Sequence, residues 1–154
     1  MRGSTDNRVM QLLGWSAAAC WCVAWFLPVV EGYAGWAAFR AALEAPFRHS
    51  IAMRGEDLVP QLLSALTNVV FVVLFANWQR GQVTRPALFL KVAIACLLLN
   101  LYWLVEMLRA GEHDALLVGY YVWLAAFALM LAAAALTASA SRRTSTTPTA
   151  GTSS

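Results

Sequence analysis

The stretch PALFLKVAIACLLLNLYWLVEML, residues 86–108, contains only two charged residues, Lys91 and Glu106, and one amide, Asn100. A helix of this length spans about 35 Å at 1.5 Å per residue, which is enough to cross a hydrocarbon core of roughly 30 Å. The stretch shows no alternation of period two, and open strand edges would leave backbone groups unsatisfied in lipid. It therefore predicts a transmembrane helix.

The rest of the chain has the same character. Of its 154 residues, 60% are hydrophobic and 12% are charged, whereas soluble domains contain about 25% charged residues. These proportions predict an all-α four-helix transmembrane bundle that forms a single membrane domain over residues 10–138, after a cytoplasmic segment 1–9. The four predicted spans cover about residues 10–30, 58–78, 86–108 and 115–138.

The first span has an alternative interpretation as a secretory signal, because Arg2 and Arg8 precede it. It is long for the apolar region of a signal, however, and it carries Trp15, Trp21 and Trp25. No clear pair of small residues for cleavage follows it. An uncleaved span is the preferred interpretation.

Basic residues predict the orientation. Seven of the eleven Lys and Arg residues and one of the eight acidic residues fall on one side of the four spans. The positive-inside rule places that side in the cytoplasm, with both termini there and two loops outside. Because the basic residues flank apolar runs, topology explains them better than nucleic acid binding does. They are Arg2, Arg8, Arg80, Arg85, Lys91, Arg142 and Arg143.

The first outer loop predicts a short amphipathic helix. Its apolar residues recur at steps of three and four beside a charged stripe of Arg40, Glu44 and Arg48, and Pro46 can divide the helix into two pieces. Such a helix either anchors the bundle at the membrane surface or forms a docking surface for an envelope partner. The candidate docking residues are Trp36, Phe39, Arg40, Leu43 and Phe47.

Polar residues also occur inside the predicted spans. Gln61, Ser64 and Asn68 form one stripe on the second span, and Asn100 lies near mid-depth in the third. In an antiparallel hairpin, Asn68 matches Asn100 in depth, and Gln61 matches Glu106. The side chains either hold the helices together or line a path for a substrate or protons.

Glu106 is the member of this set that can titrate. Arg109 follows it at a spacing of three residues, which favours an ion pair on one helix face near the membrane surface. With Gln61, Ser64, Asn68 and Asn100, these two residues complete the candidate intramembrane polar cluster.

Small residues indicate where helices can pack closely. The predicted small faces are Gly14, Ala18 and Cys22 on the first span and Ala125, Ala128, Ala132 and Ala135 on the fourth.

No catalytic set, metal site or cofactor site is predicted. Cys20 and Cys22 point about 200° apart on a helix, so they are poorly placed to share a metal ion or form a disulfide. His49 and His113 lie in different outer loops. No phosphate-binding loop or nucleophile motif occurs. Residues 139–154, rich in Ser, Thr and Ala, predict a disordered cytoplasmic tail.

Four short segments carry a resemblance. WFLP, GYAGWAAF, TNVVFVV and GYYVWLAAFALML, in that order between Trp25 and Leu131, are similar to segments of a loose group of small bacterial four-helix membrane proteins of unknown function. The resemblance implies a location in the bacterial inner membrane and implies no activity.

Three functional hypotheses follow. The first is an accessory, assembly or envelope-interaction component whose partners are the lipid bilayer and either another membrane protein or further copies of this chain. The second is a small oligomeric transporter with a polar path lined by Gln61, Asn68, Asn100 and Glu106, although the first span lacks a mid-depth acid for proton exchange. A membrane enzyme ranks last, because few titratable groups can converge.

Overall fold

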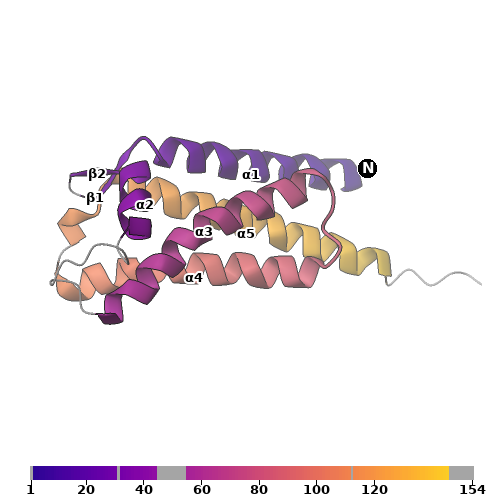
Figure 1. The fold of residues 1–154 in the computed structure, drawn as a ribbon. Coiled ribbons are helices and arrows are strands. Elements are labelled where there is room, and N and C mark those ends of the chain that lie inside the picture. Colours follow the sequence, from indigo (N-terminus) through magenta and orange to yellow (C-terminus); the bar gives the residue numbers. More distant parts are fainter. Residues whose placement is uncertain (1, 31, 45–54, 112, 146–154) are drawn as a thin grey trace, which may run out of the picture.

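The computed structural model describes the backbone of residues 2–30, 32–44, 55–111 and 113–145 (Figure 1). Side chains are described for residues 7–30, 32–44, 62–111 and 114–142.

Within these residues, nearly all of the chain is helical. Four long helices are joined by one short helix, a two-stranded antiparallel hairpin and a single 3-10 turn. In chain order the elements are α1 (Arg2–Ala24), β1 (Pro28–Val30), β2 (Tyr33–Ala34), α2 (Gly35–Glu44), α3 (Gly55–Gln79), α4 (Pro86–Ala110), η2 (His113–Ala115) and α5 (Val118–Ser145).

The four long helices lie side by side in one bundle (Figure 1). The start of α1, the end of α5 and the connection between α3 and α4 lie together, and we call this the terminal end of the bundle. The β-hairpin, α2 and η2 lie at the opposite end, which we call the hairpin end. Successive long helices therefore run in opposite directions.

Among the residues with described side chains, three helical segments are long and apolar enough to cross a membrane: Leu62–Gln79 within α3, Pro86–Ala110 of α4 and Val118–Arg142 within α5. They correspond to the second, third and fourth predicted spans. The helix that corresponds to the first predicted span, α1, packs against α5 along the bundle. Its first turns carry Asp6, Asn7 and Arg8, which lower its apolar content.

Two helix boundaries differ from the predicted spans. The helix α1 ends at Ala24, before the predicted limit at residue 30, because the chain turns toward Pro28 in β1. At the other terminus, α5 continues to Ser145, into the segment predicted to be a disordered tail. Ala140, Arg142 and Arg143 there have high helix propensity, and the Ser139 hydroxyl donates to the Ala135 carbonyl within α5.

Small residues are buried on α1 and α5, but most of them are not those predicted. On α5, Ala125 and Ala128 are exposed, so the predicted face is wrong there. On α1, Gly14 is buried but Cys22 is exposed. Gly14 is the one predicted small residue that is buried, because the rotation of each helix is set by its neighbours and not by its composition. The buried small residues are Gly14, Ala17 and Ala24 on α1 and Ala126, Ala133, Ala134 and Ala138 on α5.

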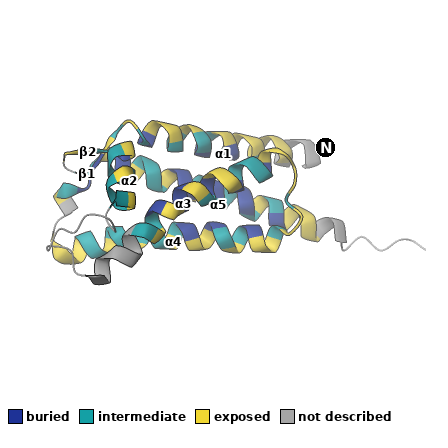
Figure 2. Cartoon of the chain, in the orientation of Figure 1, coloured by how far each residue is buried: buried dark blue, intermediate teal, exposed yellow. Residues whose placement is uncertain are grey.

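Aromatic rings fill the wider space between α1 and α3. Trp15 packs edge-on against Phe75, and Trp21 stacks on Phe71 with ring centroids 5.5 Å apart. Phe71 then meets Phe127 of α5. Figure 2 shows the buried residues concentrated where the long helices face one another.

The hairpin end is held by backbone hydrogen bonds. The carbonyls of Trp25 and Leu27, just beyond α1, accept from the amides of Trp36 and Gly35, both at 3.0 Å. Two of the four amides that lack an intrahelical partner at the start of α2 are thereby satisfied. Leu117 donates to the Val29 carbonyl at 3.0 Å, which ties the segment before α5 to β1.

Candidate functional site

The candidate intramembrane polar cluster contains a hydrogen-bonded centre. The Asn100 side chain of α4 is 4% exposed. Its amide nitrogen donates to Thr67 Oγ1 at 3.1 Å and to the Cys96 carbonyl at 2.8 Å, and its side-chain oxygen lies 3.4 Å from Ser64 Oγ. The Asn100 backbone carbonyl also accepts from the hydroxyl of Tyr120 on α5. Asn100 thus joins α3, α4 and α5.

Asn68 makes a separate connection to α1. It is 2% exposed, and its side-chain oxygen accepts the indole N–H of Trp21 at 3.0 Å. Its amide nitrogen donates to the Ala65 carbonyl at 3.2 Å. We call the six residues Trp21, Ser64, Thr67, Asn68, Asn100 and Tyr120 the core network.

The core network is chemically suited to holding helices together. It contains amides, hydroxyls and an indole, and none of its members is a carboxylate, an amine or an imidazole. Their hydrogen bonds go to each other or to nearby backbone carbonyls. Interhelical bonds of this kind contribute about 0.6 kcal/mol on average and seldom more than about 1.7 kcal/mol.

The structure brings some of the predicted polar residues together and separates others. Depth matching predicted a pair of Asn68 and Asn100, but the Asn68 side chain bonds to Trp21 instead. The Asn100 side-chain oxygen lies 3.4 Å from Ser64 Oγ, a pair that depth matching did not predict. The Gln61 side chain lies outside those described. Glu106 pairs instead with Arg109 at 3.0 Å, near the hairpin end of α4 and partly in solvent.

Sequence reasoning missed three members of the core network: Trp21, Thr67 and Tyr120. Thr67 lies one turn from Ser64, and this spacing was the available signal. Trp21 and Tyr120 each carry a polar group on a large apolar ring, and the sequence pattern contained no signal that these groups would find partners inside the bundle.

The predicted docking helix corresponds in part to α2. Trp36 is 51% exposed and Leu43 is also exposed. Phe39 instead turns inward, with its ring centroid 5.1 Å from that of Trp25. The predicted residue Phe47 lies outside the described residues. The apolar stripe is therefore divided between an exposed edge and an inward contact.

Arg40 is on the exposed side of α2 and forms an ion pair with Glu44 one turn later. The Glu44 carboxylate accepts a hydrogen bond from Arg40, and this bond, and then the negative charge of Glu44, raise the pKa of the exposed Arg40 guanidinium. Arginine is protonated in proteins at physiological pH, so a positive charge paired with Glu44 lies next to Trp36 and Leu43.

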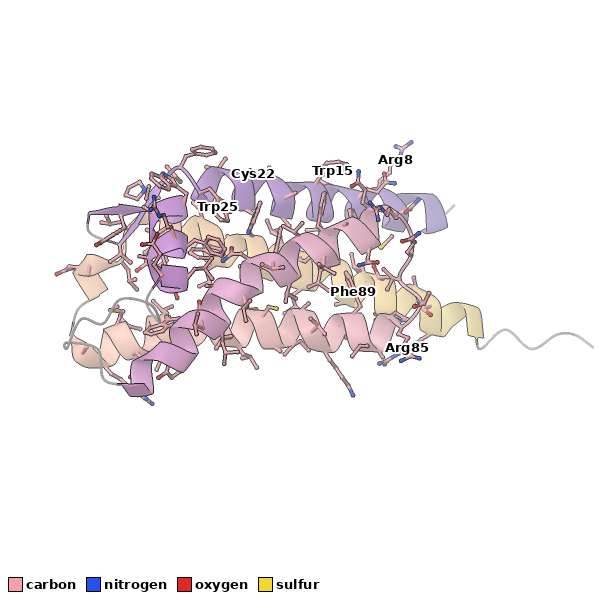
Figure 3. All side chains as sticks on the ribbon, in the orientation of Figure 1. Arg8, Trp15, Cys22, Trp25, Arg85 and Phe89 are labelled. Carbon is pink, nitrogen blue, oxygen red and sulfur yellow. The ribbon has the colours of Figure 1, made fainter. Side chains whose placement is uncertain are left out.

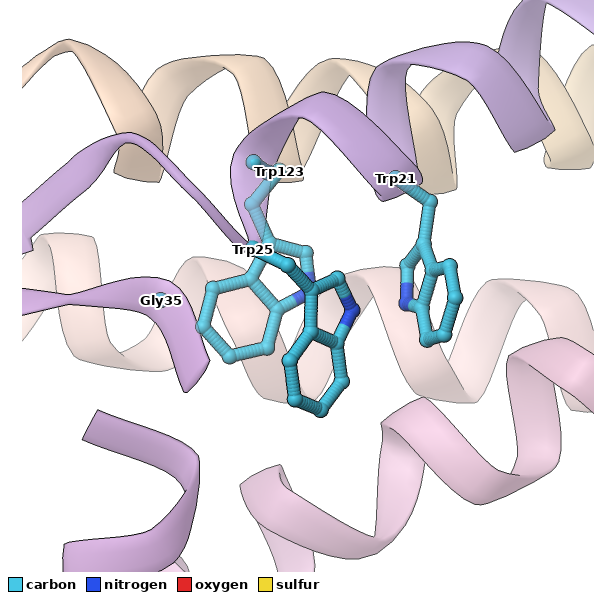
Figure 4. A pocket seen from close by; sticks show the side chains of 5 residues that line it. Trp21, Trp25, Gly35 and Trp123 are labelled. Atoms are coloured by element: carbon cyan, nitrogen blue, oxygen red, sulfur yellow. The ribbon is translucent and has the colours of Figure 1, made fainter. Parts of the chain in front are cut away.

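A small cavity lies beneath α2, with a volume of about 10 Å³. Trp21, Trp25 and Trp123 line it together with Ala24 and Gly35 (Figure 4). Among the described side chains, Trp123 has the one buried polar nitrogen without a hydrogen-bond partner. A cavity of this size has room for about one water molecule, which makes it too small for a substrate.

Metal-binding groups are not assembled in the described part of the chain: no three His, Cys, Asp or Glu side chains there could hold one ion together. Cys20, Cys22 and Cys96 are free thiols.

No protein-family model, curated protein or solved structure matches this chain. The resemblance to small bacterial four-helix membrane proteins stays a prediction.

Proposed function

We propose that this chain is a small multi-pass membrane protein that works through contacts with another membrane or envelope protein and not through catalysis. One contrast carries the proposal. The buried polar side chains Thr67, Asn68 and Asn100 are bonded within the chain, whereas Trp36 and Leu43 at the hairpin end are exposed. The groups suited to recognition thus lie outside the bundle.

The proposed topology has four spans, with α1 as the first. At about 1.5 Å per residue, α1 is about 35 Å long, and it packs along α5, which is apolar enough to cross a membrane. Arg8, Arg80, Arg85 and Arg142 belong to the terminal end, so the positive-inside rule supports a cytoplasmic location for that end and both termini. The membrane proposed is the inner membrane of a bacterium.

The proposed contact surface is the exposed edge of α2, formed by Trp36, Arg40 and Leu43. These residues follow steps of four and three on one helix face. A tryptophan and an arginine side by side are the residue types most enriched among strongly contributing interface contacts. Phe39 does not belong to this surface, because it packs on Trp25.

The alternative transporter gains less support from the geometry. A transport path would require polar groups that face a continuous opening. The side chains of Asn68 and Asn100 are instead hydrogen-bonded to Trp21, Thr67 and backbone carbonyls. Glu106 is paired with Arg109 near the surface.

Crosslinking in native membranes tests the proposal. The tagged chain is crosslinked, purified in mild detergent and analysed by mass spectrometry. A stoichiometric second protein that is released by the double substitution Trp36→Ala and Leu43→Ala is the expected result. Phe39→Ala is the matched control, because it removes an aromatic ring from the same helix on its inward side.

Other outcomes are equally informative. Retention of every partner by the double variant would show that the edge of α2 is not the contact surface. Recovery of only further copies of this chain would replace the accessory role with a homo-oligomer and direct the next measurement to flux in proteoliposomes, with Glu106→Gln as the first variant.

A further inference from the structure

A groove of about 370 Å³ opens between α3 and α4 at the terminal end of the bundle. Its walls are formed by valine and leucine side chains of both helices and by Phe89, and the residues of the connection close one end of it. The two helices are joined through Asn100 and Thr67 and diverge from there toward their connection (Figure 1). The groove occupies the space that this divergence leaves.

One end of the groove is polar. Gln82, Thr84 and Arg85 line it where the connection meets the start of α4. Arg85 and Phe89 are four residues apart and lie near each other at this end of α4 (Figure 3). A cationic side chain is thus placed at the mouth of an apolar channel.

The charge at this end is positive. Arg85 makes no ion pair with any described acidic residue. Arg80 lies five residues earlier in the chain and Lys91 six residues later, both exposed. The start of α4 adds partial positive charge from its backbone amides. The groove therefore combines an apolar channel with a positive mouth.

We propose that this groove binds an anionic glycerophospholipid, with one acyl chain between α3 and α4 and the phosphate against Arg85. The proposal rests on the membrane location and orientation proposed above, since the terminal end would then face the leaflet in which anionic lipids attract basic residues. The volume lies near the lower end of the range for small-ligand sites. It suits a narrow acyl chain better than a helix of about 10 Å diameter.

Two contacts recognise the lipid in this arrangement. The guanidinium forms charge-assisted hydrogen bonds with phosphate oxygens, for which its planar shape is well suited. The valines of α3 contact the acyl chain by dispersion, and Val73 in the wall offers a side chain that is 52% exposed. The contact between Arg85 and the phosphate determines the preference for negatively charged lipids. The apolar wall of the groove determines how strongly the acyl chain is retained.

Native mass spectrometry of the full chain tests both contacts. The protein is exchanged into mixed micelles with equal amounts of phosphatidylglycerol and phosphatidylcholine, and the retained lipids are counted. We expect the wild type to retain phosphatidylglycerol about fivefold more than phosphatidylcholine, since one interfacial basic residue contributes about that factor. Arg85→Gln should abolish the preference.

The chain supplies matched controls. Arg80→Gln removes the same charge from the same end but from a residue outside the groove lining. Val73→Trp fills the groove and should reduce the retention of both lipids. Val72→Trp adds the same side chain at a neighbouring position that is 47% exposed and does not line the groove, so retention should be unchanged.

Three results would overturn the lipid site: no preference in the wild type, equal losses from Arg80→Gln and Arg85→Gln, or release of a protein partner by Val73→Trp without any loss of lipid. Resistance of the wild type to carbonate extraction is measured in parallel. A protein extracted by carbonate contradicts the membrane location itself, whereas a resistant protein without lipid preference contradicts only the lipid site.

Discussion

The indole N–H of Trp21 on α1 donates to the side-chain oxygen of Asn68 on α3 across 3.0 Å. The two residues are 47 positions apart in the chain, and the bond crosses the wide, aromatic interface between these helices. It gives Trp21 a partner, whereas the indole nitrogen of Trp123 is buried without one. Trp21 and Trp123 line the same small cavity, but only the indole N–H of Trp21 has a hydrogen-bond partner.

Replacement of these tryptophans by phenylalanine should separate the contribution of that bond. Trp21→Phe keeps an aromatic ring near Phe71 but leaves the Asn68 oxygen without its donor, so we expect a loss of about 1 kcal/mol in the free energy of unfolding. Trp123→Phe removes a donor that has no partner and should cost less. Reversible unfolding in mixed detergent micelles measures both. Equal losses would show that ring size, and not the hydrogen bond, decides stability here.

Asn100→Leu should destabilise the bundle by about 1–2 kcal/mol, because Thr67 and Ser64 lose their partner at nearly constant side-chain volume. The same unfolding measurement applies. Asn77→Leu is the control, since the Asn77 amide bonds only to the Val73 carbonyl of its own helix in an exposed position. If both variants lose the same free energy, the core network does not stabilise the bundle.

Gly14→Ala should force α1 away from α3. A methyl group at this position would overlap the six-membered ring of the buried Trp78. We expect a loss of about 1–3 kcal/mol, as for other overpacked interiors. Trp78→Leu in the same chain removes the ring, so the double variant should recover part of the loss relative to the sum of the single variants. Strict additivity would contradict the proposed overlap.

Gly35→Ala should disturb the seat of α2. An added methyl group there would overlap the Ala24 carbonyl, which is backbone and cannot rotate away. The expected result is faster proteolysis between α1 and α3 and weaker partner capture through Trp36. Gly32→Asn is the control, because its position has a φ of 80° and open space around it, and asparagine tolerates that conformation. Similar proteolysis of the two variants would argue against the overlap.

Sidedness can be tested with single cysteines in a chain whose three natural cysteines are replaced by alanine. With the terminal end in the cytoplasm, a cysteine at Gly81 should be protected from an impermeant maleimide in intact cells, whereas one at Gly111 should react. Both glycines have positive φ and open surroundings, so the two sites are matched. Labelling at Gly81 and protection at Gly111 would reverse the proposed topology.

Much of the architecture could be predicted because long apolar runs determine it locally. Apolar runs of about 20 residues must form helices, since backbone groups in a bilayer have no other partners. The ion pair between Glu106 and Arg109 is equally local, because a spacing of three residues places both on one helix face. Depth matching also brought Asn100 to the level of the polar stripe on α3, because both helices rise equally from a short connection. The partner that Asn100 finds in this stripe is Ser64, however, and not the predicted Asn68.

What the sequence alone could not determine is the rotation of each helix about its axis. Rotation decided that Asn68 bonds to Trp21 and that Ala126, not Ala125, faces inward. It also directed Phe39 toward Trp25, leaving Trp36 exposed on the same helix. Each long helix carries apolar residues on almost every face, so hydrophobicity alone distinguishes the faces of a helix only weakly. The packing of side chains against neighbouring helices determines the rotation of each helix. These contacts form only when the bundle has assembled.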